Sequence, residues 1–133
     1  MVSNTIKMKA GKYTIGDPCY VVPKEMWKDF CAALNTKSNE FRCIKAFVFR
    51  GHEFYVSDTY EGDGHYGSNH FSGTGFSVDS GLIGAVPGAF ILEFGCRSKA
   101  SEECICIDVG EYSTAEYNDG RITFDELEIY TRR

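Results

Sequence analysis

Long apolar runs and a secretory start are missing from this sequence. No apolar stretch approaches the roughly 20 residues that a membrane-spanning helix needs. The opening residues, MVSNTIKMKAGKY, also lack the apolar centre of a signal peptide. We therefore expect a cytoplasmic protein that does not enter a membrane.

A surplus of basic residues is missing as well. The 133 residues include 14 Lys and Arg against 19 Asp and Glu, which gives a formal net charge of −5. A surface that follows nucleic-acid phosphates needs a basic face, so nucleic acid is not expected as a partner. Apolar residues at 43% and charged residues at 25% are typical of a soluble globular protein. The length suits one domain over residues 1–133.

The six cysteines lack the spacing of a zinc site or a redox motif. There is no Cys-x-x-Cys pair, and the close pair Cys104 and Cys106 would lie on one face of a strand. Cys31 falls on the apolar side of an expected helix and Cys43 falls in an apolar strand, where free cysteine behaves as a small apolar residue. We interpret the cysteines as buried structural thiols, with metal or redox roles as the alternative.

Common enzyme signatures are absent too. The sequence has no Gly-x-Ser-x-Gly elbow, no G-x-x-x-x-G-K-S/T phosphate loop and no dinucleotide-binding fingerprint. Nucleophilic catalysis also needs a serine or cysteine beside a base, and no such pattern can be recognised. These absences favour a protein that is not an enzyme.

What the sequence does contain is one helix pattern among many short apolar segments. Apolar residues at three- and four-residue steps predict a helix from about Lys24 to Asn35, and Pro23 suits its first turn. About eight short strands follow one another without β-α-β alternation, which indicates antiparallel pairing. The expected fold is α+β, with a curved, mainly antiparallel sheet packed on this single amphipathic helix.

Two strand hairpins can be predicted from the turns. Residues 5–10 and 12–16 flank Gly11 and are expected to pair with each other. Residues 41–49 and 53–58 flank Gly51 and are also expected to pair.

Two further segments have clear apolar or turn character. Asn118-Asp119-Gly120 predicts a tight turn between later strands. Residues 82–94, LIGAVPGAFILEF, are expected to form core strands around a turn at Pro87 and Gly88. The alternative is that they line an apolar pocket or form an edge that docks a partner.

Residues 59–75 form a 17-residue stretch of low apolar content that begins TYEGDGHYG. Such a length is uncommon in a compact domain, and it indicates a functional loop or an overlooked element. Asp63, His65 and His70 carry groups that bind divalent metal ions, although their spacing matches neither an EF-hand nor an H-E-x-x-H motif. A metal site and a solvated turn are both open interpretations.

The glycines and tyrosines of the same stretch favour a ligand-binding loop. Glycines allow positive φ and close approach, and tyrosine rings offer a flat apolar face with a hydroxyl tip. A small polar ligand, such as a nucleotide, would need a basic residue for its phosphates, and Arg50 and Arg97 are the leading candidates. The predicted ligand-binding residues are Tyr60, Glu61, Asp63, His65, Tyr66, Asp17, Asp79 and Arg50.

Asp17 and Asp79 each lie at the edge of a strand. A carboxylate in such a position commonly caps its own backbone in an Asx turn. The alternative is an acidic cluster of Asp17, Asp63 and Asp79 that shares a cation or acts with His65 in acid-base chemistry.

The sequence segments GDPCYV, GDG-x-Y and VDSG resemble motifs of a group of small, uncharacterised phage and bacterial proteins. Here they correspond to residues 16–21, 62–66 and 78–81, together with a tryptophan-bearing helix at Trp27. His65 and Gly67 depart from the usual pattern around the tyrosine. The resemblance implies a viral or bacterial setting, which for a phage-encoded chain means the host cytoplasm, and it brings no activity with it.

Three functions follow as hypotheses. The first is a non-enzymatic, phage-type accessory domain that binds a small polar ligand or a host protein, with a sequestering or inhibitory role in counter-defence and no cofactor. The second is a metal-dependent hydrolase that uses Asp63, His65, His70 and Asp79 around a divalent ion. The third is a structural or assembly protein whose apolar strands form a homo-oligomer.

Overall fold

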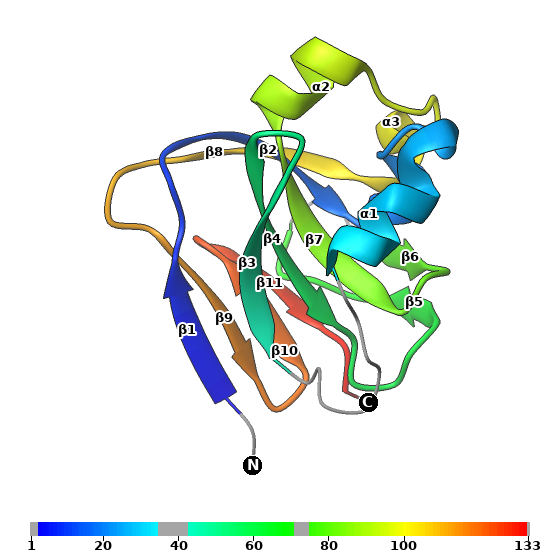
Figure 1. Cartoon of the computed structure of the whole chain (residues 1–133). Helices are drawn as coiled ribbons and strands as arrows, with labels where there is room; N and C mark the ends of the chain where they lie inside the picture. Colours follow the sequence, from blue (N-terminus) through cyan, green and yellow to red (C-terminus); the bar gives the residue numbers. More distant parts are fainter. Residues whose placement is uncertain (1–2, 35–42, 71–74, 133) are drawn as a thin grey trace.

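Two sheets and a layer of helices build the protein, as Figure 1 shows. The structure is a computed structural model, and it describes residues 3–34, 43–70 and 75–132. The strands are β1 (Ser3–Lys7), β2 (Gly11–Gly16), β3 (Ile44–Phe49), β4 (His52–Asp58), β5 (Gly64–Tyr66), β6 (Phe76–Val78), β7 (Leu82–Pro87), β8 (Ile105–Val109), β9 (Thr114–Asn118), β10 (Arg121–Phe124) and β11 (Leu127–Tyr130). The helices are α1 (Trp27–Leu34), α2 (Gly88–Phe94) and α3 (Ala100–Glu103), with 3-10 turns η1 (Pro18–Tyr20) and η2 (Lys24–Met26).

All the strand pairings are antiparallel. The five-stranded sheet has the order β3-β4-β7-β2-β8, and the four-stranded sheet has the order β1-β9-β10-β11. A short third sheet joins β5 to β6. The five-stranded sheet therefore has β3 at one edge and β8 at the other.

The central strands of the five-stranded sheet are buried on both faces. In β4, the Tyr55 side chain packs in the core toward the four-stranded sheet, while its neighbours Phe54 and Val56 pack in the core toward the helices. This alternation follows from the period of two along a strand. The sheet is the middle layer of the molecule, and β4 and β7 are apolar on both faces because they lie inside it.

The aromatic ring of Phe30 on α1 is the centre of the core under the helices. It is fully buried, and its centroid lies 5.2 to 5.4 Å from those of Phe47, Phe49, Phe54 and Trp27. Burying a phenylalanine of this kind contributes about 1.5–3 kcal/mol relative to leaving it in water. The apolar stripe read from the sequence is what fixes α1 on the sheet.

The expected α+β class, the antiparallel pairing and the main helix are confirmed. The segment from Lys24 begins as the 3-10 turn η2 and continues as α1. The hairpin around Gly51 is confirmed as β3–β4, and the turn at Asp119 and Gly120 joins β9 to β10 with positive φ at both residues. None of the helices in the described residues is both long and apolar enough to cross a membrane.

The hairpin expected around Gly11 is wrong. Strand β1 pairs with β9 and β2 pairs with β7 and β8, so the chain crosses from one sheet to the other between them. Two tyrosine hydroxyls hold this crossing at Lys9, whose N–H donates to Tyr55 at 2.8 Å and whose carbonyl accepts from Tyr13 at 2.7 Å. Adjacency in sequence predicted the pairing, but the crossing lets both sheets bury their inner faces.

The second half of the apolar stretch 82–94 is a helix and not a strand. Strand β7 ends at Pro87, and α2 then occupies residues 88–94, with Phe90 fully buried and Leu92 exposed. A nearly uniform apolar sequence hides the 3.6-residue period, so the two structures cannot be told apart by pattern alone.

Candidate functional site

The stretch TYEGDGHYG is held at both ends by the C-terminal strand. The N–H of Tyr60 donates to the Thr131 hydroxyl at 3.0 Å, and the Arg132 guanidinium lies 4.9 Å from the Tyr60 ring centroid. At the other end, the N–H of Tyr130 donates to the Gly67 carbonyl at 2.9 Å. The stretch is therefore an ordered connection between the sheets.

Inside the stretch, the Gly62 carbonyl is the acceptor that holds the turn together. This carbonyl accepts hydrogen bonds from the hydroxyl of Tyr66, at 2.7 Å, and from that of Thr59. Tyr66 is buried in the core between the sheets. The Tyr66 side chain therefore stabilises the loop through its hydrogen bond to Gly62, and its ring packs in the core and is not available to a ligand. Glu61 and Asp63 are exposed.

His65 lies on β5, so the stretch 59–75 contains an element, which was the alternative to a functional loop. It faces Ser77 of β6 in register, with 3.2 Å between Nδ1 and the serine hydroxyl oxygen. The strand gives a weak pattern because it has only three residues, one of which is Gly64, and glycine has little strand propensity. His65 is exposed on this two-stranded sheet.

Asp17 is the most constrained of the predicted site residues. Its side chain is fully buried, and one carboxylate oxygen accepts from the N–H groups of Asp79 and Ser80 at 2.7 and 2.8 Å. The other accepts from the Cys19 N–H at 2.9 Å and the Ser80 hydroxyl at 2.5 Å. A buried charge is tolerated when donors surround it in this way. Asp17 ties the 79–81 turn to η1.

The carboxylate of Asp79 lies on the outer side of the same turn. It accepts from the Tyr20 hydroxyl at 2.5 Å, and the Lys99 ammonium lies 6.0 Å from the Tyr20 ring centroid. Burial raises the pKa of Tyr20 above its ordinary value, and the hydrogen bond to Asp79 raises it further. The phenol therefore stays protonated and acts as a donor.

The expected cluster of Asp17, Asp63 and Asp79 forms in part. Asp17 and Asp79 meet at the 79–81 turn, and Asp63 Oδ1 would lie 3.8 Å from a Cβ added to Gly81. However, both oxygens of Asp17 are already occupied by donors. In the described parts of the chain, no three His, Cys, Asp or Glu side chains lie close enough together to hold a metal ion.

The two arginines considered for a phosphate lie elsewhere. Arg50 is at the β3–β4 turn, where its guanidinium is 3.1 Å from the carboxylate of Asp29 on α1. The Arg97 guanidinium donates through Nε to the Val22 carbonyl at 2.7 Å. Arg50 therefore belongs to the helix side of the molecule and does not serve the 59–70 stretch.

All six cysteines are free thiols, but they are not all buried. Cys96 and Cys106 are exposed and the other four are half-buried, which corrects the expectation of buried structural thiols. Burial raises the pKa of Cys104 to about 12, with the charge of Asp17 as the next cause. Burial also raises the pKa values of Cys19 and Cys31.

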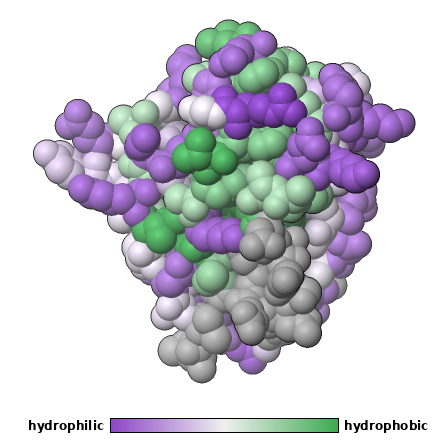
Figure 2. All heavy atoms as spheres, viewed as in Figure 1, coloured by the Kyte–Doolittle hydropathy of each residue, from purple (hydrophilic) through white to green (hydrophobic). Residues whose placement is uncertain are grey.

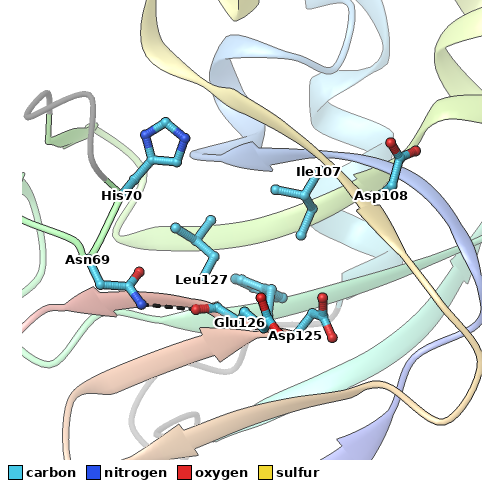
Figure 3. A pocket seen from close by; sticks show the side chains of 8 residues that line it. Asn69, His70, Ile107, Asp108, Asp125, Glu126 and Leu127 are labelled. Atoms are coloured by element: carbon cyan, nitrogen blue, oxygen red, sulfur yellow. Dashed lines mark hydrogen bonds between the residues drawn. The ribbon is translucent and has the colours of Figure 1, made fainter.

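Two hollows border strand β8, one on each face of the five-stranded sheet. The first, of about 430 Å³, lies toward the β10–β11 hairpin and contains His70, the one predicted site residue found in it. Figure 3 shows Ile107 pointing toward the hairpin and Asp108 pointing the opposite way. The lining residues are Asn69, His70, Ile107, Asp108, Phe124, Asp125, Glu126 and Leu127.

The second hollow is an apolar groove of about 640 Å³ between α2 and the sheet. We call it the α2 groove. Its lining is Lys12, Tyr13, Thr14, Gly88, Ala89, Ile91, Leu92 and Cys106. The side chain of Leu92 at its rim is 90% exposed. Figure 2 shows hydrophobic residues at the top of the molecule, where α2 lies.

The sequence reading that centred on residues 59–70 missed the α2 groove. Its one signal was the surplus of apolar residues in 82–94, for which docking of a partner was an alternative. We compared the chain with protein-family models, curated proteins and solved structures, and none matches it.

Proposed function

We propose that this protein is a non-enzymatic binding domain that holds a protein partner in the α2 groove. The observation that carries the proposal is the 90% exposure of Leu92 beside this groove. Single exposed apolar side chains are normal on a protein surface, but Leu92 adjoins the apolar lining of the groove, and contiguous apolar surface is typical of interaction sites.

The rigidity of α2 supports this role. Phe90 of α2 is fully buried, and its ring centroid lies 5.0 Å from those of Phe54 in the sheet and Phe94 in the helix. Leu92 is therefore presented by an anchored helix. Covering a leucine with a partner contributes about 1.5–3 kcal/mol, and a preformed site loses little conformational entropy on binding.

A protein partner fits the lining better than a nucleotide. Apart from Lys12, the α2 groove is lined by apolar or uncharged residues. The hollow on the other face of β8 has Asp125 and Glu126 among its lining residues, and carboxylates repel phosphates. The basic residue expected to hold a phosphate, Arg50, is engaged with Asp29.

The biological setting stays a proposal based on the motif resemblance. A phage-type accessory domain that sequesters or inhibits a host protein in counter-defence needs a docking surface and no catalytic centre. The α2 groove supplies such a surface.

A peptide selection tests the proposal. A randomised ten-residue peptide library is panned against the folded domain, and the Kd of the most enriched peptide is measured by fluorescence anisotropy. We expect Leu92→Asp to weaken this peptide at least about tenfold, because a charge would replace the apolar contact at the rim of the groove.

Val48→Asp is the matched control. Val48 is 63% exposed on β3, the opposite edge of the same sheet. The Val48→Asp variant should bind the selected peptide with unchanged affinity. Equal melting temperatures of the Val48→Asp and Leu92→Asp variants should show that both fold. Failure to enrich any peptide, or equal binding to the Leu92→Asp variant, would overturn the proposed function.

A further inference from the structure

We infer that the partner contributes an extended segment that joins β8 as an additional antiparallel strand. This inference rests on the proposed function, and it specifies how the partner binds and which residues it carries. Sheets that recognise peptides in this way use main-chain hydrogen bonds for affinity and side-chain pockets for specificity.

The first step of the argument is that β8 is an open edge. It pairs with β2 over residues 105–109, and none of the strands in the described ranges 3–34, 43–70 and 75–132 pairs with its other side. In an antiparallel ladder, alternate residues of an edge strand turn their N–H and C=O groups outward. Within the described residues, no other backbone hydrogen bond involves β8 beyond its ladder with β2.

The second step is that each face of β8 has its own hollow. Cys106 lines the α2 groove on the helix face, and Ile107 lines the hollow toward the β10–β11 hairpin on the other. Side chains of an added strand would alternate between these two faces. Each residue that pairs with β8 therefore meets a hollow. The α2 groove is apolar, and the hollow toward the hairpin has Ile107, Phe124 and Leu127 beside the carboxylates of Asp125 and Glu126. An unpaired edge with a hollow on each face is what strand addition requires.

The third step is charge. Residues 100–120 contain β8 and both of its flanks, and this segment has no Lys or Arg. Its acidic residues on β8 or close to it in sequence are Glu102, Glu103, Asp108 and Glu111, while Glu116 and Asp119 are paired with Arg121 and Arg132. Asp108 is exposed on β8, with Lys12 opposite it on β2. A basic residue on the added strand would continue this alternation, and opposite charges that face one another across strands are stabilising.

These steps define the partner segment. In antiparallel register, its residue opposite Asp108 is Lys or Arg and shares the helix face. The next residue, opposite Ile107, is apolar and enters the hollow floored by Phe124 and Leu127. The third, opposite Cys106, is apolar and reaches Leu92 in the α2 groove. The recognised pattern is therefore basic-apolar-apolar in an extended chain.

The synthetic peptide TTKLLTT, blocked at both ends, carries this pattern and serves as the probe. Binding to the ¹⁵N-labelled domain is followed by NMR titration. We expect shifts concentrated on the β8 amides and a preference over TTELLTT of up to about fivefold, the size of one cross-strand charge pair. Asp108→Lys should reverse that preference. Absence of binding at millimolar concentration would overturn the inference.

Backbone pairing is tested separately with N-methylated peptides. Two versions of TTKLLTT carry N-methyl groups at alternate residues, one at odd positions and one at even positions. Strand addition predicts that one version loses at least about tenfold in affinity and the other binds normally, because only one set of N–H groups faces β8. Equal binding by both versions would rule out strand addition.

The two proposals can fail separately. If selected peptides depend on Leu92 while TTKLLTT does not bind or both methylated versions bind equally, the docking function stands and strand addition is wrong. If Leu92→Asp has no effect on any peptide, both are wrong. A dimer in sedimentation that protects the β8 amides would also overturn the inference, since a second copy would then occupy the edge.

Discussion

The buried carboxylate of Asp17 accepts both the backbone N–H and the hydroxyl of Ser80, which lies 63 residues later in the chain. This pair joins the end of β2 to the turn that enters β7, its neighbour in the sheet. Two of the sequence motifs, GDPCY and VDSG, are thereby explained as one structural unit. Asp17 is a positioning residue for the turn.

Replacing Asp17 should therefore destabilise the fold strongly. Asp17→Ala leaves three backbone N–H groups and a hydroxyl without their acceptor, and we expect a loss of about 3 kcal/mol in the free energy of unfolding. Asp17→Asn keeps one acceptor oxygen and should lose about half as much. Urea denaturation measures both.

Asp79→Asn is the control for this prediction, because Asp79 is exposed and accepts from the Tyr20 hydroxyl. It should cost less than about 1 kcal/mol. Equal losses for the Asp17 and Asp79 variants would contradict the structural role of Asp17.

The parts of the fold that sequence predicted are those with a local cause. The stripe on α1 has a helical period, and the Asp119-Gly120 turn needs positive φ, so both can be read from neighbouring residues. The crossing at Lys9 depends on Tyr55, which is 46 residues away. No local pattern contains that contact, and the pairing of β1 was accordingly predicted wrongly.

The candidate site shows the same division. The sequence allows the prediction that Asp17 and Asp79 lie in one acidic cluster. Only the structure shows that both carboxylate oxygens of Asp17 already accept hydrogen bonds from within the protein. Of the residues chosen for chemistry, only His70 lies at a hollow that borders β8. The α2 groove depends on which face of α2 is covered, and an almost uniformly apolar sequence does not reveal that.

Two residues of α2 should respond oppositely to truncation. Phe90 is fully buried and Leu92 is 90% exposed. Phe90→Ala should cost about 3–5 kcal/mol because it opens a cavity under the helix. Leu92→Ser should change stability by no more than about 0.5 kcal/mol. Thermal melting compares the two. A large loss for Leu92→Ser would mean that its side chain is packed and not available to a partner.

The cysteines should differ in reactivity. The thiolate is the reactive form, so a thiol whose pKa is raised by burial reacts slowly. We expect iodoacetamide at pH 8 to modify the exposed Cys96 and Cys106 first. Cys104, whose pKa burial raises to about 12, should react only after unfolding. Mass spectrometry of timed samples distinguishes the sites, and early modification of Cys104 would show that its side chain is accessible.

Stability should fall as the pH rises above about 9. The folded-state pKa of Cys104 is about 12, above its ordinary value of 9.0. Between these values the thiol ionises in the unfolded chain and stays protonated in the folded one, so ionisation favours unfolding. Melting temperatures under reducing conditions should decrease from pH 9 to pH 11, and Cys104→Ser should show a smaller decrease. An unchanged profile in that variant would assign the effect to other groups, such as the phenols of Tyr20 and Tyr55.

Asn69 should be needed to keep the first hollow in shape. Its amide nitrogen donates to the Glu126 carbonyl at 2.9 Å, and its amide oxygen accepts from the Glu128 N–H at 2.8 Å. The side chain thus pairs with β11 as a short strand would. Asn69→Ala removes both bonds, at about 1 kcal/mol each, and should speed hydrogen exchange at the Glu128 amide.

Asn69→Asp separates the two bonds, because it keeps the acceptor oxygen and loses the donor. It should therefore preserve most of the protection at Glu128. Nearby, the Tyr130 N–H donates to the Gly67 carbonyl and gives an internal reference. If hydrogen exchange at the Glu128 amide in Asn69→Ala stays as slow as at the Tyr130 amide, backbone pairing alone holds β11 in place beside the hollow. If exchange rises at Glu128 alone, the Asn69 amide is what fixes the rim of the hollow into which we place the partner's central apolar residue.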